Sequence, residues 1–448
     1  MSKLPTPLEY QKKGVDFLVR GKNQLLLADE MGLGKTPQLI WAAKDIGAER
    51  IHVVCPAVAK FNWQKEFLKF SNGKYQAEVA GDGHNHWNRP VIVTSFEYAA
   101  KYLHKYVQYR RDLLIVDEAH YLKEPTSQRT KRILGARGLI HNARRSWFAT
   151  GTPAPNHAGE LWVFLYTFGL TKLSYDGFIS RYCTSHRTGG RYSRIQITGT
   201  DTKHSHELKN IFRGQYLRRL AKDELDLPPL IHNPYYVEPD QDSEILKHFP
   251  DLKDKIKGEF ELLKENLDFA TNVSDEKLLN ALSLMSQSIM SLRRYHGLKK
   301  VAPVANLIRS ELQAQEYKKI IIFGIHKDVL TYLKRTLDYE FKPLMITGET
   351  PAAERQQIVE RFQEDDECRV FIGNIHAAGT AITLTAANQV GFIEQDWVPG
   401  NNAQAAKRAH RIGQKLPVFT RHFAIRNSID EKITAALTRK INEIATFI

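Results

Sequence analysis

At 448 residues the chain is too long for one ordinary hydrophobic core, and its 42% hydrophobic and 25% charged residues are typical of a soluble globular protein. It has no bilayer-length apolar run and no signal-peptide core, and Cys55, Cys183 and Cys368 are too far apart for a zinc site or disulfide framework, so we expect a reducing compartment. The formal net charge of +14 favours a polyanionic partner, most simply nucleic acid.

Short apolar runs recur along the chain and predict buried strands. In the first half these runs are residues 24–28, 51–55, 90–94, 113–116 and 146–150. In the second half they are residues 320–323, 344–346, 370–372, 390–393 and 418–420. Near-continuous hydrophobic strands that alternate with helical stretches indicate a parallel sheet covered on both faces. We therefore predict an α/β fold of two doubly wound parallel-sheet lobes, with helical insertions between the motifs.

The middle of the chain is rich in aromatic and basic residues, from about residue 156 to residue 226. Residues 188–191 predict a hairpin turn within it. From Arg181 to Lys222 there are ten lysines and arginines but only two acids, so this stretch supplies +8 of the net charge. The surplus is therefore a localised patch, which favours DNA contact over a merely solvated surface.

Prolines mark the end of this basic insertion. The segment from Pro228 to Pro239 predicts an inter-lobe linker, and residues 242–298 are expected to be helical. The predicted domains are a first lobe at residues 1–230 that includes the basic insertion, a linker and helical insertion at 231–300, and a second lobe at 301–448.

The clearest motif is a phosphate-binding loop at residues 29–36, which follows a predicted strand and opens a helix. Asp29 stands where the general pattern has its first glycine. Gly32 and Gly34 still let backbone N–H groups face phosphates, and Lys35 can reach the β and γ oxygens. The Thr36 hydroxyl can hold Mg²⁺. The predicted ATP-binding residues of the loop are Asp29, Glu30, Met31, Gly32, Leu33, Gly34, Lys35 and Thr36.

Two carboxylates, Asp117 and Glu118, directly follow the strand predicted at residues 113–116. They therefore lie at the carboxyl end of that strand, where open α/β sheets bind ligands. Alone, such a pair is usually a helix N-terminus, but beside a phosphate loop it predicts catalysis. Asp117 would hold Mg²⁺, and Glu118 would orient and deprotonate the attacking water.

Two arginines near the other end, Arg408 and Arg411, are three residues apart, a spacing that would put both on one face of a helix. A phosphate loop and a distant arginine pair predict an ATPase whose site is complete only when two lobes close.

These motifs, with residues 149–153 and 410–414, resemble the Swi/Snf-like ATPases of helicase superfamily two. The resemblance covers nearly the whole chain and implies two RecA-like lobes and ATP-driven translocation on double-stranded DNA. Residues 293–300 look closest to the annealing-helicase, HepA-related branch. The resemblance also implies that Gln11 contacts adenine and that Arg408 and Arg411 are arginine fingers. The residues assigned to coupling between hydrolysis and DNA are His120, Thr150, Gln404 and Gln414.

Double-stranded or forked DNA is expected to lie across both lobes. The predicted DNA contacts are Lys60, Thr94, Ser95, Arg187, Arg191, Arg194, His326, Lys327, Trp397 and Asn401. Three positions depart from the family's pattern: Lys407 stands for an acid, Ala381 for a glycine and Thr383 for an asparagine. These departures affect the tuning of lobe closure and strand contact, and they leave the reaction unchanged.

Weaker signals give mostly structural predictions. The tyrosines at residues 98, 102, 106 and 109 are interpreted as a packing face, and the histidine pairs at 84/86 and 204/206 as solvated, so magnesium is the only metal expected. We expect a monomer with no membrane partner. The absence of flanking zinc-finger or chromatin-reading modules and of a basic nuclear localisation run favours a bacterial or phage origin and a cytoplasmic location, or the nucleus if the protein is eukaryotic.

Two alternatives remain. One is a strand-separating DEAH-type helicase or the motor subunit of a restriction system, against which residues 410–414 argue. The other is an ATP-insensitive DNA-binding scaffold, against which the intact Lys35, Asp117, Glu118 and Arg411 argue.

Overall fold

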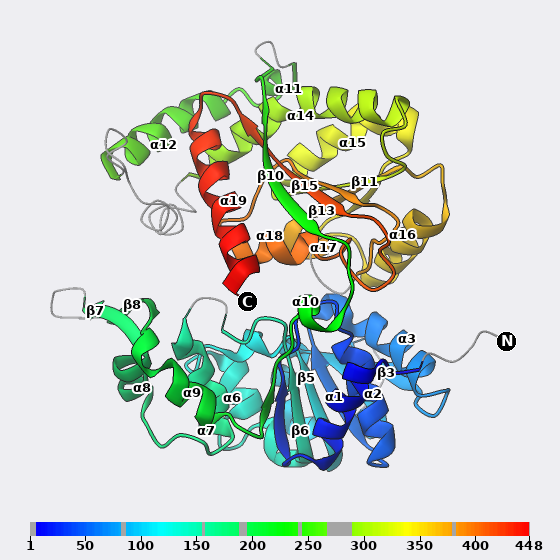
Figure 1. Ribbon diagram of the computed structural model, residues 1–448, viewed down its shortest axis with the longest axis vertical. Coiled ribbons are helices and arrows are strands. Elements are labelled where there is room, and N and C mark those ends of the chain that lie inside the picture. The colour runs from blue at the N-terminus through cyan, green and yellow to red at the C-terminus, as the bar shows by residue number, and fades with distance from the viewer. Residues whose placement is uncertain are drawn as a thin grey trace. The chain divides into compact units, whose positions relative to one another are not determined.

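The computed structural model describes residues 6–81, 87–154, 157–187, 195–240, 244–266, 289–378 and 382–447. The chain divides into two compact units, Met1–Leu225 and Asp226–Ile448, and each is built on its own parallel sheet (Figure 1). Within the described ranges, no helix combines the length and apolar character that crossing a bilayer requires.

The first unit is built on a sheet with the strand order β3-β4-β2-β5-β6-β1-β9, in which all neighbours are parallel. Its strands are β1 (Gln24–Leu27), β2 (Ile51–Cys55), β3 (Ala77–Val79), β4 (Val91–Ser95), β5 (Arg111–Asp117), β6 (Ala143–Ala149) and β9 (Tyr216–Leu217). Its helices are α1 (Glu9–Arg20), α2 (Lys35–Asp45), α3 (Lys60–Phe70), α4 (Phe96–Lys101), α5 (Leu103–Tyr106), α6 (Gln128–Leu134), α7 (Trp162–Thr167), α8 (Tyr175–Tyr182), α9 (Ser205–Ile211) and α10 (Ala221–Glu224). Short 3₁₀ helices are η1 (Ala57–Ala59), η2 (Ala119–Leu122), η3 (Leu139–Asn142), η4 (Ala158–Leu161) and η5 (Thr202–His204).

The apolar runs of the first half form the predicted strands. β2 and β4 are buried at every position, as strands covered on both faces should be. In the basic stretch, β7 (Cys183–Arg187) and β8 (Ile195–Thr200) pair antiparallel and form the arms of the predicted hairpin. The predicted turn at 188–191 lies outside the described residues.

The second unit is built on a sheet with the order β10-β15-β14-β11-β13-β12, again with parallel neighbours. Its strands are β10 (Leu230–Val237), β11 (Ile320–Gly324), β12 (Leu344–Ile346), β13 (Val370–Asn374), β14 (Gln389–Phe392) and β15 (Val418–Ile425). Its helices are α11 (Glu244–Lys247), α12 (Leu252–Asn266), α14 (Met290–Gln313), α15 (Lys327–Phe341), α16 (Ala352–Glu364), α17 (Ile375–Ala378), α18 (Pro399–Ala406) and α19 (Ile429–Phe447).

Alternating residues of β11 show why its apolar run is continuous. Ile320 and Ile322 belong to a core with residues of α14 and α15, whereas Ile321 and Phe323 belong to a second core with residues of α16 and α18. Because successive side chains of a strand point to opposite faces, both faces of this sheet are covered. The predicted α/β class with doubly covered parallel sheets is confirmed.

The proline-rich segment after residue 227 differs from the predicted linker. Residues 230–237 form β10, which pairs in register with residues 418–425 of β15. β10 is the edge strand of its sheet, where Pro234, which lacks a backbone N–H, costs no internal ladder bond. Prolines predict a chain break here, whereas Pro234 lies within the strand and only restricts it to an edge of the sheet.

β10 and β15 enclose two buried histidines. His232 Nδ1 lies 3.2 Å from His422 Nε2 and 2.7 Å from Thr420 Oγ1. Burial, together with the charges of Lys407 and His410, lowers the pKa of His232 to about 4, and burial holds the pKa of His422 well below its usual value. Both imidazoles are therefore neutral at neutral pH.

Candidate nucleotide-binding site

The phosphate loop connects β1 to α2, as the sequence predicts. Gly32 and Gly34 have φ angles of 92° and 68°, in the left-handed region that glycine enters without strain. A Cβ at Gly34 would lie 2.7 Å from Gln11 Nε2, so a side chain there would displace the Gln11 amide from the loop. Lys35 begins α2 directly after this turn, which places backbone N–H groups and an ammonium at one helix start.

Lys35 folds over its own loop. Its Nζ donates to the Asp29 carbonyl at 2.8 Å and, more weakly, to the Glu30 carbonyl at 3.4 Å. An anion on the loop would offer the ammonium stronger, charged acceptors than these carbonyls. The lysine is thus held close to where phosphate oxygens would lie.

Gln11 lies in α1 beside this loop and is buried. Its side-chain Nε2 donates to the Leu33 carbonyl at 3.3 Å, and its Oε1 accepts from the Leu8 backbone N–H at 2.9 Å. The neighbouring Tyr10 hydroxyl donates to the same Leu33 carbonyl at 3.0 Å. Two residues of α1 therefore fasten it to the phosphate loop, and the adenine contact of Gln11 stays a prediction.

The carboxylate pair lies at the carboxyl end of β5. Trp63 Nε1 donates to one Asp117 oxygen at 2.9 Å, and the Glu118 backbone N–H donates to the other at 2.9 Å. Burial and the adjacent Glu118 carboxylate raise the pKa of Asp117 to about 6. Glu118 has a φ of 49°, which a non-glycine residue adopts only under strain.

His120 connects this pair to the end of β6. Its Nδ1 lies 2.9 Å from Thr150 Oγ1 and 3.3 Å from a Glu118 carboxylate oxygen. Thr150 Oγ1 also accepts from the Thr152 backbone N–H at 3.1 Å. The structure therefore brings Glu118, His120 and Thr150 into one chain of contacts, and their coupling role stays a prediction.

The arginine pair of the second unit does not lie on a helix. α18 ends at Ala406, and Arg408 and Arg411 occupy the turns that follow it. Gln414 holds these turns, since its side-chain Nε2 donates to the carbonyls of Thr385, Ala387 and Ala409 at 3.0–3.3 Å. The predicted shared helix face is wrong, because three-residue spacing fits a folded turn as well as a helix.

The two arginines differ in exposure. Arg408 is only 2% exposed, whereas Arg411 is half-buried and donates to the Thr383 hydroxyl at 3.2 Å. Gln404, on α18, has a buried side-chain nitrogen for which the described residues provide no hydrogen-bond partner. Gln414 is engaged within its own turn, as described above.

The predicted DNA contacts of the first unit are partly enclosed. Thr94 is fully buried, with its hydroxyl 2.9 Å from His52 Nε2. Because this side chain cannot reach DNA, the predicted contact through it is corrected. The Ser95 hydroxyl caps α4 by accepting from the Tyr98 backbone N–H at 3.1 Å. Lys60 is half-buried and donates to the Ala80 carbonyl at 2.8 Å. The side chains of Arg187, Arg191 and Arg194 lie outside the described residues.

In the second unit, each predicted DNA-contact residue has a partner within the protein. His326 Nδ1 lies 2.5 Å from the buried Glu394 carboxylate, and Lys327 is exposed and forms an ion pair with Glu349. The Arg293 guanidinium stacks 4.1 Å from the Trp397 ring centre. Asn401 donates to Asp396 at 3.1 Å.

Of the weaker signals, the tyrosine stripe is resolved as packing. Trp87 contacts the rings of Tyr98, Tyr102 and Tyr106, which confirms packing for these three tyrosines of the predicted face. His84 and His86 lie outside the described residues. Across the described ranges, no group of three or more histidine, cysteine or acidic side chains gathers as a metal site.

Two further arginines, Arg218 and Arg219, lie at this site, although the sequence groups them with the basic stretch that is predicted to contact DNA. Arg218 donates to the carbonyls of Ala28 and Gly151, and Arg219 contacts the carboxylate of Asp29. Their only signal was an arginine pair directly before α10, which composition alone cannot tell from a DNA-binding patch.

A phosphate loop after β1 and a carboxylate pair after β5, in a protein of two parallel α/β units, define a phosphate-loop nucleotide-binding protein. The chain belongs to the SNF2-related family: the SNF2-related domain matches residues 10–317, and the helicase conserved C-terminal domain matches residues 299–413. The resemblance found in the motifs is confirmed.

Similar curated proteins come from animals and a yeast. The DNA annealing helicase and endonuclease ZRANB3 of Bos taurus is 28% identical over 97% of this chain and 40% of its own length. The SWI/SNF-related matrix-associated actin-dependent regulator of chromatin subfamily A-like protein 1 homolog of Caenorhabditis elegans is 29% identical over 97% of this chain and 60% of its own length. The ATP-dependent helicase fft1 of Schizosaccharomyces pombe is 28% identical over 96% of this chain and 52% of its own length.

The chain thus spans about 40–60% of the length of these relatives. They are eukaryotic proteins and give no support to the predicted bacterial or phage origin. Among solved structures, the Sulfolobus solfataricus SWI2/SNF2 ATPase core in complex with dsDNA is 23% identical, with a TM-score of 0.46, over 99% of this chain and 96% of its own.

Proposed function

We propose that this protein is a DNA-dependent ATPase that translocates on double-stranded or forked DNA, with annealing-type remodelling as its output. The observation that carries the proposal is the joined site of the first unit, where the phosphate loop, the Asp117–Glu118 pair and the His120–Thr150 contact all lie at the carboxyl ends of β1, β5 and β6. Family membership and relatives named as helicases support it.

ATP would bind with its phosphates on the loop. The N–H groups around Gly32 and Gly34 and the Lys35 ammonium would hold the phosphate oxygens, while Gln11 contacts the adenine. These groups are close enough to serve one nucleotide, because Gln11 Nε2 already contacts the Leu33 carbonyl of the loop.

Thr36 and Asp117 would hold Mg²⁺. The donor set fits this ion, because a hydroxyl and a carboxylate are hard oxygen ligands and a second carboxylate, Glu118, directly follows Asp117. Bound there, Mg²⁺ would neutralise charge on the β and γ phosphates.

Glu118 would accept the proton of the attacking water, and its strained backbone holds the carboxylate at the edge of the sheet. The contact between His120 and Thr150 would link that base to the segment after β6 and so couple hydrolysis to DNA. Arg411, the more exposed of the two arginines, is our main arginine finger, with Arg408 supporting it and Gln404 and Gln414 shaping the turn.

DNA binding is proposed from charge and from the relatives. The hairpin of β7 and β8 includes Arg187 and lies within the basic stretch from Arg181 to Lys222. Lys60, Lys327, Trp397 and Asn401 remain proposed contacts. We propose that the protein works as a monomer, in the nucleus if it is eukaryotic and in the cytoplasm if it is bacterial.

The test is ATP hydrolysis by the full chain with no DNA, single-stranded DNA, duplex and forked DNA. Duplex or forked DNA should stimulate turnover well above single-stranded DNA, with displacement of a triplex strand but no separation of a plain duplex. Equal stimulation by single strands would contradict the proposed substrate. Separation of a plain duplex would favour the DEAH-type helicase or restriction motor, and DNA binding without hydrolysis would favour the scaffold.

A further inference from the structure

The guanidinium of Arg219 contacts three segments of the first unit at once. Its Nε donates to Asp29 Oδ1 at 2.9 Å, and a terminal nitrogen contacts the other oxygen of the same carboxylate. A terminal nitrogen also donates to Gln38 Oε1 of α2 at 2.7 Å, and the other contacts the Tyr10 backbone carbonyl of α1. The phosphate loop, α2 and α1 therefore share one cation.

The Asp29–Arg219 pair is enclosed. The Asp29 side chain has no exposed surface, and that of Arg219 is 9% exposed. Asp29 also accepts from Gln38 Nε2 at 3.2 Å, and the same Gln38 nitrogen donates to the carbonyls of Leu33 and Gly34 at 3.1 Å each. Removing one partner of such a pair leaves an uncompensated buried charge, which is costly.

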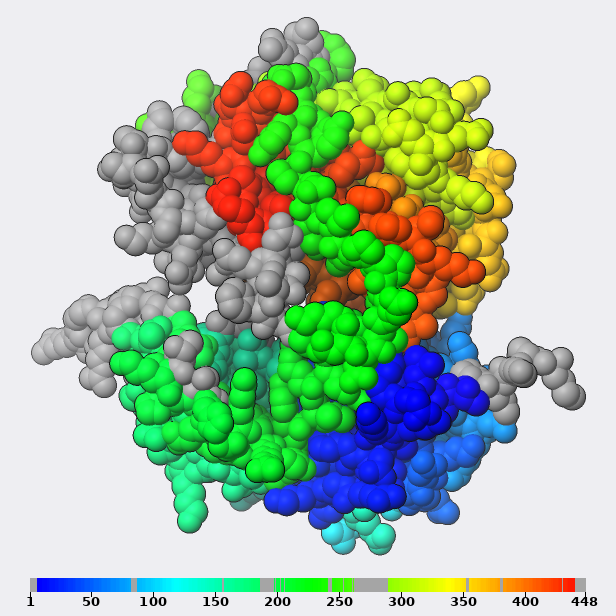
Figure 2. Space-filling view, in the orientation of Figure 1, coloured from blue at the N-terminus to red at the C-terminus, as the bar shows by residue number. Residues whose placement is uncertain are grey.

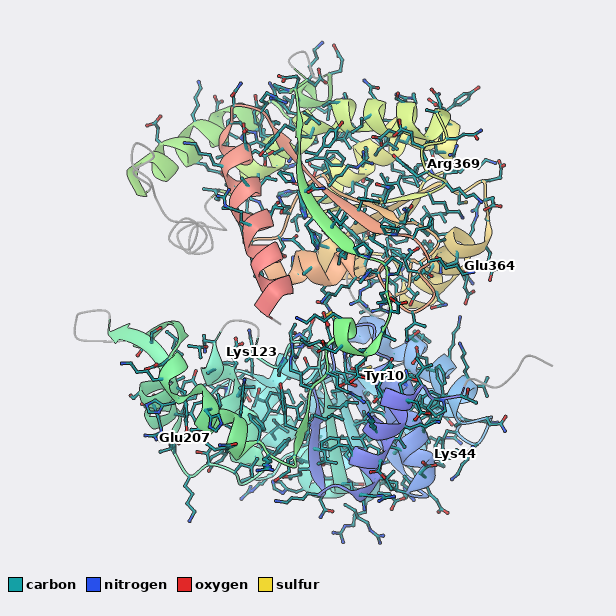
Figure 3. The ribbon with its side chains drawn as sticks, in the orientation of Figure 1. Tyr10, Lys44, Lys123, Glu207, Glu364 and Arg369 are labelled. Atoms are coloured by element: carbon teal, nitrogen blue, oxygen red, sulfur yellow. The ribbon has the colours of Figure 1, made fainter. Side chains whose placement is uncertain are left out.

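The fold reserves space for this arrangement. A Cβ on Gly14 of α1 would lie 1.8 Å from Gln38 Oε1 and 2.7 Å from an Arg219 nitrogen, so a larger residue there would displace both groups from this arrangement. Tyr10 is labelled in Figure 3 close to the green ribbon of α10, and Figure 2 shows blue surface next to green surface. The contact of Arg219 with the Tyr10 carbonyl joins these parts of the chain.

The chain around Arg219 is fastened to the same loop by its backbone. The Glu30 N–H donates to the Arg219 carbonyl at 2.9 Å, and the Ala221 N–H donates to the Glu30 carboxylate at 2.6 Å. The Ala28 N–H donates to the Leu217 carbonyl at 2.7 Å. Residues 217–221 therefore pack against the phosphate loop through backbone hydrogen bonds, although composition groups them with the stretch that is predicted to bind DNA.

We propose that Arg219 is a positioning residue of the nucleotide site: it holds the phosphate loop through Asp29 and the adenine-side helix α1 through Tyr10 in one binding-competent arrangement. The proposal rests on the nucleotide-binding part of the proposed function. It also explains why an aspartate replaces the first glycine of the general loop pattern, since that position supplies the carboxylate that Arg219 binds.

The test compares Arg219→Gln with Arg213→Gln in the full chain. Arg213 is an exposed arginine of the same basic stretch, so its variant loses the same charge outside the site. The measurement is the Kd for fluorescent ADP, from the midpoint of a titration. Arg219→Gln should weaken binding about tenfold or more, the scale of one charge-assisted hydrogen bond, while Arg213→Gln stays within about twofold.

This readout separates positioning from folding. The folded fraction of each variant is measured first by circular dichroism, because reversible unfolding raises the apparent Kd by the inverse of that fraction. After this correction, a wild-type Kd in Arg219→Gln overturns the proposal. If Arg219→Gln does not fold, Arg219→Lys carries the test, because lysine keeps the charge but cannot reproduce the fork of donors. It should weaken ADP binding about threefold or more, and wild-type affinity would again overturn the proposal.

A double variant tests the route through the loop. Asp29→Asn and Arg219→Gln remove the same link, so the double variant should bind ADP about as weakly as the weaker single variant. Multiplied effects would mean that the two residues act independently, against the proposal. The titration contains no DNA, so a wild-type chain that binds ADP but ignores DNA would contradict the proposed translocase and leave this inference standing.

Discussion

Mild acid is expected to weaken the second unit through the histidine pair of β10 and β15. Burial, with Lys407 and His410 nearby, holds the pKa of His232 at about 4, against 6.5 for the ordinary side chain. The unfolded chain therefore binds more protons than the folded unit. The stability that comes from the neutral imidazole is full above pH 6.5 and falls as the pH drops toward 4. Between pH 7.5 and 5.0 the loss from His232 alone is about 2 kcal/mol.

The assay is native-state hydrogen exchange of peptides that cover residues 230–237 and 418–425, at pH 7.5 and 5.0 and corrected for the intrinsic exchange rate. His232→Asn is the matched variant, because its amide can pair with Thr420 and does not titrate. Lys407, His410 and His422 face residue 232 and are present in both proteins, so their contributions largely cancel in the comparison. Wild type should lose about 2 kcal/mol more opening free energy than the variant over this interval. Equal losses would refute the reasoning.

Glu118→Gln should lower turnover roughly 10²–10⁴-fold while leaving the Kd for ATP nearly unchanged, because it removes the base and keeps the loop; single-turnover hydrolysis near the wild-type rate would exclude this role. Arg411→Ala should lower DNA-stimulated turnover of the full chain roughly 10³-fold, and a mild effect would make the buried Arg408 the main finger. Alanine at the three hairpin arginines, residues 187, 191 and 194, should weaken duplex binding for all sequences and flatten the slope of log affinity against log salt by up to about 3. An unchanged slope would place this hairpin away from DNA.

The fold could be predicted where a local pattern determines it. A strand buried on both faces needs a continuous apolar run, and each predicted run is a strand in the structure. β3 has Glu78 at its centre and β9 spans only two residues, so neither shows such a run. β10 is not predicted by the local pattern, because Pro234 is typical of a chain break, and only the sheet order shows that the strand lies at an edge.

The site divides in the same way. The phosphate loop and the carboxylate pair are contiguous in sequence and could be recognised there. The contact of Arg219 with Asp29 joins residues 190 positions apart, and no local pattern encodes it. The spacing of Arg408 and Arg411 fits a helix and predicts one. In the structure both lie in turns, which the hydrogen bonds from Gln414 to the Ala387 and Ala409 carbonyls stabilise.

The pairing of β10 with β15 has a consequence for how the chain acquires its structure. The first strand of the second unit has a single neighbour in its sheet, and that neighbour is the last strand of the chain. Such a non-local parallel pair forms slowly, because the entropy of closing a long loop is lost before any hydrogen bond between the strands can form. During synthesis, β10 therefore leaves the ribosome long before its partner exists, while the sheet of the first unit can already assemble. We expect the β10 amides to gain protection no earlier than those of β15 during refolding, an order that pulsed hydrogen exchange would either register or contradict.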